Sequence, residues 1–369
     1  MKNSLGQSVI VTLFGESHGP AIGAVIDGLA PGIKIDTDYI DSKLELRKPY
    51  GRVSTARHEA DNYSIISGVY NDLSTGTPIC IIIPNSAQKS EDYETARGTL
   101  RPGHADYTAN AKYHGFEDYR GGGHFSGRIT AALVAAGALI QSALEQKGIK
   151  IGTHIAKMGI VEDASMGETE EDIAKNIEEL AAKRFAVLDD KMSDLMQQLI
   201  EEAAAEGDSI GGVLETAVTG VPAGAGEPWF DTLEGMLAHG LFSIPGIKGV
   251  EFGVGFSGTD KKGSEYNDAL YMDGDTVKTK TNNNGGINGG ISNGMPIIVR
   301  TAVKPTPSIY KAQESVDINS GTDAVIEIKG RHDPAIIHRA RVVQDAVTAI
   351  VLADLLALRY GTDWLSEKK

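Results

Sequence analysis

Histidine, arginine and glycine gather in the stretch from Arg101 to Arg128, RPGHADYTANAKYHGFEDYRGGGHFSGR. It holds three of the thirteen arginines of the chain, three of its nine histidines and a run of three glycines. Histidine gains or loses a proton near neutral pH, and guanidinium groups bind carboxylates and phosphates through two parallel hydrogen bonds. The stretch therefore predicts acid–base chemistry on a small anionic molecule.

An apolar segment with helical spacing follows the glycine run. Apolar residues recur at intervals of three and four from Ile129 to Leu144, just after Ser126, and Gly148 is expected to end the helix. The backbone N–H groups at the start of such a helix, together with its dipole, favour an anion. We therefore expect a phosphorylated small molecule to bind near the glycine run.

The chain as a whole is acidic, although its arginines are clustered. A formal net charge of −15 and a pI near 5.1 argue against a nucleic-acid-binding or membrane-surface protein. Nine arginines form three groups: Arg47, Arg52 and Arg57; Arg101, Arg120 and Arg128; Arg331, Arg339 and Arg341. This clustering predicts binding of a multiply charged small anion. The segment 47–61 is then either an anion-contacting flap or a solvated surface loop.

Residue spacing argues against several other kinds of site and location. P-loop and GxGxxG fingerprints are missing, and the histidines lack zinc-site spacing, so we expect no metal.

Cys80 is the only cysteine, which excludes an intrachain disulfide and predicts a buried, inert thiol in a reducing cytoplasm. The N-terminus lacks a signal-peptide pattern. The longest apolar run, 129–140, is 12 residues and suits a core helix better than a membrane span.

The hydrophobic pattern predicts one interwoven α/β domain over residues 1–369, with substantial antiparallel sheet. The helix over 37–47 is expected to begin with a cap from Thr37 or Asp38. A long, mostly buried helix is expected to have Pro334 at its first position. The acidic section 162–206 predicts two surface helices rather than a metal site. Strands are expected at 8–14, 24–26, 63–70, 78–83, 210–222, 247–256, 297–303 and 324–328.

Five segments closely resemble the signatures of the chorismate synthase family. In order over about residues 8–358, they are GESHGPAIGAVIDGLAPGI, RPGHADYTANAKY, DYRGGGHFSGR, GISNGMPIIVRTAVKPTPSI and GRHDPAIIHRARVVQDA. The resemblance implies that 5-enolpyruvylshikimate 3-phosphate is converted to chorismate and phosphate by a trans-1,4-elimination. It further implies a need for reduced FMN without net redox change, with NADPH as a candidate reductant. The implied fold is α/β (α+β), a β–α–β sandwich with antiparallel sheets and buried helices, assembled as a homotetramer.

The same resemblance implies roles for five residues in the reaction. His18 would protonate the departing phosphate, and His104 would lie near N1 of the reduced flavin. Asp333 would lie near N5 of the flavin and help to remove the substrate proton. The hydroxyl groups of Ser17 and Ser126 would orient this proton network.

The implied binding residues form two sets. The substrate anions would contact Arg47, Arg52, Arg101, Arg128 and Arg331. FMN would contact His124, Phe125, Ser126, Pro245, Gly246, Gly289, Lys304, Pro305, Thr306, Pro307, Ser308 and Arg331. The chain departs from many family members at 124–125 and 245–246, where backbone atoms rather than side chains would contact the flavin.

Two other functions fit parts of the sequence. A histidine-dependent phosphatase or phosphomutase would explain RPGH and GRHDP as an Arg-His phosphate site. Such an enzyme would form a phosphohistidine and would need no flavin. A non-catalytic flavin-binding protein would instead bind FMN without consuming a phosphorylated substrate.

Overall fold

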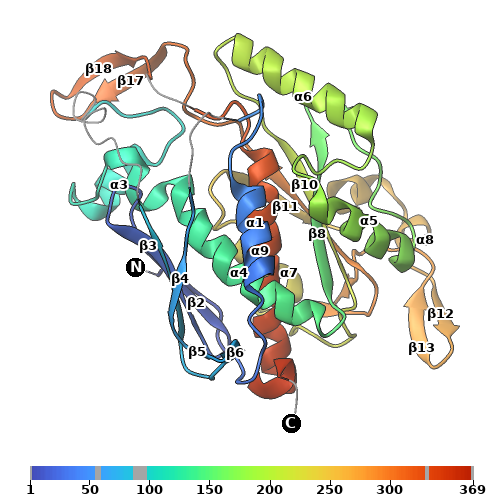
Figure 1. Cartoon of the computed structure of the whole chain (residues 1–369). Coiled ribbons are helices and arrows are strands. Elements are labelled where there is room, and N and C mark those ends of the chain that lie inside the picture. The colour runs from blue at the N-terminus through green and yellow to red at the C-terminus, as the bar shows by residue number, and fades with distance from the viewer. Residues whose placement is uncertain (1, 55–59, 86–97, 329–331, 367–369) are drawn as a thin grey trace.

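The computed structural model describes residues 2–54, 60–85, 98–328 and 332–366. Two five-stranded antiparallel sheets enclose a layer of helices (Figure 1). The strand order is β1-β2-β3-β7-β4 in the first sheet and β11-β16-β10-β8-β9 in the second. The expected sandwich of antiparallel sheets around buried helices is therefore confirmed.

The first sheet is built from the N-terminal part of the chain. β2 (Ile10–Gly15) pairs with β3 (Ala21–Asp27), and β3 pairs with β7 (Ile79–Pro84). β3 is longer than the three residues expected. Gly23 lies within it. Only glycine fits at this position, because a Cβ would lie 2.3 Å from the Phe14 ring. The short strands of this region are β1 (Ser4–Leu5), β4 (Ser64–Ser67), β5 (Val69–Tyr70) and β6 (Leu73–Ser74).

The second sheet has one face toward the central helices and the other covered by a separate helical layer. Its strands are β8 (Lys150–Met158), β9 (Val161–Glu162), β10 (Gly212–Thr219), β11 (Ile247–Phe252) and β16 (Ile297–Val303). The two helices expected in the acidic section are confirmed as α5 (Glu170–Ala182) and α6 (Asp190–Ala205). α5 packs on the outer face of β8, where Ile177 lies against Gly152. Only one side of α5 and α6 is buried, which explains their many exposed carboxylates.

Four helices form the middle layer: α1 (Thr37–Arg47), α4 (Thr130–Glu145), α7 (Leu233–Leu241) and α9 (Ile337–Tyr360). α4 packs against β3 and α9 against β8, so these two helices join the sheets (Figure 1). The helical stretch Gly127–Glu145 is apolar and long enough to cross a membrane, but 89% of its most apolar window is buried inside the protein. α4 agrees with the helix expected after Ser126, and it continues past the 12-residue apolar run because Gln141 is also buried and donates a hydrogen bond to the Ile151 carbonyl.

The remaining elements connect these layers. They are α3 (Asp106–Tyr113), α8 (Gly263–Tyr266), the short 3-10 helices η1 (Arg120–Phe125), η2 (Gly127–Ile129), η3 (Gly255–Asp260) and η4 (Thr362–Leu365), and the strands β12 (Leu270–Asp273), β13 (Thr276–Thr279), β14 (Ile287–Asn288), β15 (Ile291–Ser292), β17 (Gln313–Asp317) and β18 (Thr322–Ile326).

Three local expectations were wrong. α1 is capped by Asp36, whose carboxylate accepts a hydrogen bond from the Tyr39 amide at 2.9 Å. α9 begins at Ile337 rather than Pro334, because the Pro334 carbonyl accepts from the Ile210 amide instead of starting a helical ladder. Cys80 is only half-buried, and that burial raises the pKa of its thiol.

His154, in β8, ties the second sheet to the start of α6. Its Nδ1 lies 2.7 Å from Asp163 and its Nε2 lies 3.3 Å from Glu215. Asp163 also accepts hydrogen bonds from the backbone amides of Leu188 and Asp189. Burial alone would lower the pKa of His154, but the two carboxylates outweigh it and raise this pKa above its ordinary value.

We expect the contribution of His154 to the free energy of unfolding to decrease at alkaline pH. Its folded-state pKa lies above the unfolded value of about 6.5, so its contribution is complete below that pH and is lost as the pH rises through the folded pKa. His154→Gln should cost about 3 kcal/mol of unfolding free energy at pH 6 and less at pH 9, because a buried carboxylate loses its cation. Urea unfolding across this range measures the difference. Parallel pH profiles for the two proteins would contradict it.

Candidate active site

The triple-glycine loop brings two histidines together. Gly121, Gly122 and Gly123 all have positive φ, at 59°, 84° and 54°. A Cβ on Gly121 would lie 2.3 Å from Cε1 of His18, and one on Gly122 would lie 3.3 Å from Cε1 of His104. Only glycine combines this backbone conformation with such close approach. Consecutive glycines therefore place both imidazoles against one short loop.

The His18 loop, between β2 and β3, is fixed through its backbone. The Ser17 amide donates to the Gly123 carbonyl at 3.0 Å. The Asn85 side chain donates to the carbonyls of Glu16 and Gly19 at 3.0 and 2.9 Å. The Ser17 hydroxyl is buried and has no hydrogen-bond partner within the described ranges. The loop thus offers a hydroxyl to a ligand beside His18.

Asp106 and Arg101 both contact one nitrogen of His104. Its Nδ1 lies 2.6 Å from an Asp106 carboxylate oxygen, which can only accept, and 3.1 Å from Nη2 of Arg101, which can only donate; the shorter contact to Asp106 favours a proton on Nδ1. Arg101 donates to the same carboxylate from Nε and Nη2 at 2.8 and 2.7 Å. Burial raises the pKa of Asp106, but the hydrogen bonds from His104 and Arg101 hold it well below its usual range. The other nitrogen of His104, Nε2, faces Gly122.

The segment after β16 packs beside His104. The Lys304 ammonium donates to the Gly103 carbonyl at 2.5 Å, and Pro307 lies against Gly103. The Lys304 amide donates to the Gly246 carbonyl at 2.9 Å. These contacts gather Lys304–Ser308, Pro245–Gly246 and Arg101–His104 in one place. The Thr306 hydroxyl is buried there without a hydrogen-bond partner in the part of the chain that the structure describes.

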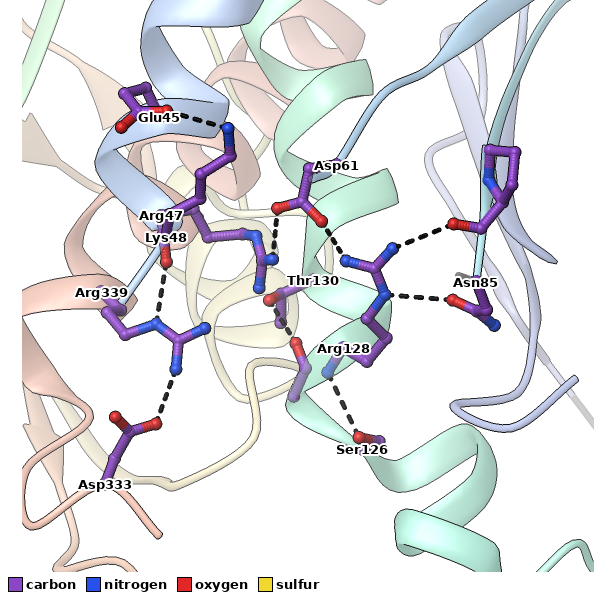
Figure 2. A network of polar contacts seen from close by, with 12 residues as sticks. Glu45, Arg47, Lys48, Asp61, Asn85, Ser126, Arg128, Thr130, Asp333 and Arg339 are labelled. Atoms are coloured by element: carbon purple, nitrogen blue, oxygen red, sulfur yellow. Dashed lines mark hydrogen bonds and ion pairs between the residues drawn. The ribbon is translucent and has the colours of Figure 1, made fainter. Parts of the chain in front are cut away.

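Two of the predicted substrate arginines share one carboxylate. Arg47, the last residue of α1, and Arg128, before α4, both pair with Asp61 (Figure 2). Their exposed fractions are 2% and 9%. Arg52 is exposed. The two end residues of the segment 47–61, Arg47 and Asp61, are therefore buried and do not fit a solvated surface loop, while the anion-contacting flap stays a prediction; Arg57 lies outside the described residues.

Asp333 is held by an arginine that the sequence analysis did not select. Arg339 Nη1 donates to Asp333 at 2.6 Å, and Arg339 Nε donates to the Arg47 carbonyl at 2.8 Å (Figure 2). Burial, and then the charge of Arg101, lower the pKa of His332, the residue before Asp333. Arg331 lies outside the described residues.

The remaining candidate residues have contacts of their own. His124 donates from Nδ1 to the Gly15 carbonyl at 2.8 Å, and Phe125 packs edge-on against Tyr113. Ser126 accepts from the Arg128 amide and so caps the turn that leads into α4. Gly289 lies at the β14–β15 turn, where its neighbour Gly290 packs against Thr232, the N-cap of α7, whereas Pro245–Gly246 follow the other end of α7. The length of α7, about 14 Å, therefore lies between Gly289 and Pro245–Gly246.

Comparison with known proteins agrees with this arrangement. The chorismate synthase family model matches residues 9–357. Chorismate synthase of Dehalococcoides mccartyi is 47% identical over 362 residues, which cover 98% of both chains. The Pyrococcus abyssi enzyme is 46% identical over 354 residues, covering 96% of this chain and 97% of its own. A crystal structure of chorismate synthase aligns with a TM-score of 0.77 at 30% identity, covering 97% of this chain and 94% of that chain.

The chain belongs to the chorismate synthase family. It is a carbon–oxygen lyase of chorismate biosynthesis, as the sequence predicted. The phosphatase alternative has no support. Groups of three or more histidine, cysteine or carboxylate side chains able to hold a metal are absent from the described residues.

Four residues around this chorismate synthase site escaped the sequence analysis: Asp61, Asn85, Asp106 and Arg339. Asp106 follows His104 by two residues, and Arg339 belongs to the third arginine group, so both carried a local signal. Asp61 and Asn85 carried none, because their partners are distant in sequence.

We expect Gly121→Ala to displace His18 and to reduce kcat about 10²–10⁴-fold, because the family resemblance implies that this histidine is a proton donor and losing one usually costs that much. The new Cβ would lie 2.3 Å from the imidazole and 3.0 Å from the Ser17 hydroxyl. Gly148→Ala is the matched control, because Gly148 also has a positive φ, of 81°, but its Cβ would meet nothing within 4 Å. Steady-state kinetics and thermal unfolding of both variants test this. Equal losses of activity in the two variants would assign the effect to backbone strain.

Proposed function

We propose that this chorismate synthase releases phosphate from 5-enolpyruvylshikimate 3-phosphate with reduced FMN held beside the triple-glycine loop. The observation that carries the proposal is the placement of His18 and His104 against consecutive glycines. Lys304 contacts the residue that precedes His104. One loop thus joins the histidine proposed to act on the phosphate to the segment proposed to bind the cofactor.

The residues beside His104 fit a flavin phosphate. Lys304 supplies a cation, and the buried Thr306 hydroxyl lacks a partner among the described residues, so a bound phosphate oxygen could satisfy it. We propose that FMN is held by the following set: His124, Phe125, Ser126, Pro245, Gly246, Lys304, Pro305, Thr306, Pro307, Ser308 and Arg331. When bound, reduced flavin supplies electron density that assists loss of the phosphate and is regained by the end of the reaction.

The protein residues are proposed to handle the two protons. The elimination breaks one C–H bond and one C–O bond, so one group takes a proton and another gives one to the departing phosphate. Asp333, oriented by Arg339, helps to remove the substrate proton. His18 protonates the phosphate, with Ser17 and Ser126 orienting the network. The hydrogen bond to Asp106 keeps Nε2 of His104 directed to the glycine loop.

Arginines are proposed to bind the two carboxylates and the phosphate of the substrate. The proposed set is Arg47, Arg52, Arg101, Arg128 and Arg331. Fixed guanidinium groups suit this task because two parallel hydrogen bonds to each anion also set its orientation. Asp61 and Asp106 hold three of these side chains in place.

We further propose one domain over residues 1–369, because α4 and α9 pack on each other and on different sheets. The proposed enzyme is a cytoplasmic homotetramer with no nucleic-acid or membrane partner, and NADPH is its candidate reductant. A second copy of the chain would best supply Gly289 to the flavin, since α7 separates this glycine from the other proposed contacts.

The function is tested by anaerobic phosphate release from 5-enolpyruvylshikimate 3-phosphate with and without photoreduced FMN. We expect release only with the reduced cofactor, and no phosphohistidine. Equal release without flavin would overturn the cofactor assignment.

His18→Ala and His104→Ala should fail in different ways. Each should lower turnover about 10²–10⁴-fold. In His18→Ala, the spectrum of the bound reduced flavin should stay nearly normal, because this histidine is assigned to the phosphate. In His104→Ala, the protonation of the bound reduced flavin should change, visible in its absorbance as pH is varied. Identical flavin spectra in the two variants would refute the division of roles.

A further inference from the structure

Asp61 is a fully buried carboxylate between two arginines from different parts of the chain. Its side chain has 0% exposure. One oxygen lies 2.5 Å from Nη2 of Arg47, and the other pairs with Nη1 of Arg128 (Figure 2). Burial alone would raise the pKa of Asp61, but the two guanidinium groups hold it below its ordinary range. Asp61 is therefore ionised and shared between the two cations.

The backbone at Asp61 indicates that this placement is enforced. Its φ is 49°, a left-handed conformation that is uncommon outside glycine, although aspartate adopts it more readily than most residues. Such a conformation persists where the surrounding contacts determine it. Here the two ion pairs hold Asp61 in place: one joins it to Arg47 at the end of α1, and the other joins it to Arg128 in the turn before α4.

The contacts of Asp61 continue in both directions toward the proposed reacting groups. Arg128 Nε donates to the Asn85 side chain at 3.1 Å, and Asn85 in turn clamps the His18 loop through the Gly19 carbonyl. On the other side, the Arg47 carbonyl accepts from Arg339. Arg339 pairs with Asp333 at 2.6 Å. A polar network thus runs from the His18 loop to Asp333, with Asp61 near its centre. Figure 2 shows its part from Asn85 to Asp333.

We propose that Asp61 is a positioning residue that fixes the Arg47 guanidinium for the substrate anion, with Arg128 as the brace on its other side. This inference rests on the proposed substrate-binding role of Arg47. A long side chain at a helix end has many rotamers, and binding gains when they are fixed in advance.

The test compares Asp61→Asn with Asp163→Asn. Asp163 is also a buried carboxylate paired with a cation, but it lies on the outer face of the second sheet. Asp61→Asn should raise KM, and the Kd of a non-reacting substrate analogue, about tenfold or more, while the Kd of FMN measured alone stays unchanged. Asp163→Asn should lower the thermal midpoint while leaving KM unchanged. A lower midpoint with unchanged KM in Asp61→Asn would overturn the proposal, and so would tighter analogue binding.

A double-mutant cycle with Arg47→Lys shows whether Asp61 acts through Arg47. We expect Asp61→Asn to weaken analogue binding much less in the Arg47→Lys protein than in the wild type, because the side chain that it positions is already altered. Additive effects would overturn the proposal. Asp61→Glu is the second variant should Asp61→Asn not fold; it keeps the charge but moves the carboxylate, and an unchanged KM in it would also overturn the proposal.

The results that would contradict the proposed function differ from those that would contradict only the Asp61 proposal. Arg47→Lys alone with unchanged analogue affinity would remove the substrate role of Arg47, and with it the Asp61 proposal, before any Asp61 variant is measured. Wild-type activity without reduced FMN would overturn the cofactor assignment only, because analogue binding needs no turnover.

Discussion

The close crossing of α4 and α9 is the constraint on which the site depends. A Cβ on Gly137 would lie 2.3 Å from the Ala346 Cβ and 2.5 Å from its Cα, so the two helices meet with almost no side chain between them. Arg128, just before α4, pairs with Asp61, and Arg339, in the first turn of α9, donates to the Arg47 carbonyl; Asp61 and Arg47 pair with each other. The two helices therefore start at the same end of the molecule. Their positive dipole ends lie where the anionic substrate is proposed to bind.

Four of the described arginines near that end have a carboxylate that fixes their direction. Asp61 pairs with Arg47 and Arg128, Asp106 pairs with Arg101, and Asp118 pairs with Arg120. A buried guanidinium without a partner would cost several kcal/mol of desolvation, so these pairs make clustered arginines compatible with folding. They also explain why clustering in the sequence overstates the charge available to a ligand. The arginines are better described as oriented donors than as an open positive surface.

The sequence predicted most of the elements, because hydrophobic periodicity is local. The helix over Thr37–Arg47 and the strand over Ile297–Val303 match the structure residue for residue. Some of its errors came from contacts with distant segments. Pro334 could not begin α9 because its carbonyl bonds to Ile210. The 47–61 segment could not be assigned as flap or surface loop, because its burial depends on a partner before α4.

The same division holds for the candidate site. The glycine run and its histidines are contiguous motifs, so their types and spacing indicated a site before any fold was known. The network around Asp61 and Asn85 joins segments far apart in the chain, and no local pattern marks which carboxylate a given arginine will find. Asp106 shows the intermediate case. It lies two residues from His104, yet its control of the imidazole tautomer is apparent only from the atomic contacts.

The rotation of α9 about its own axis is set by polar groups that lie outside the site. The helix is buried from Ile337 to Ala357, and a helix buried on all sides has little hydrophobic preference for one rotation. Asp345 accepts from Thr153 at 2.6 Å, and Asp354 accepts from the amides of residues 7–9. Turning the helix by one residue, about 100°, would leave these buried carboxylates unpaired. That penalty fixes which side of α9 carries Arg339, and through Arg339 the position of Asp333.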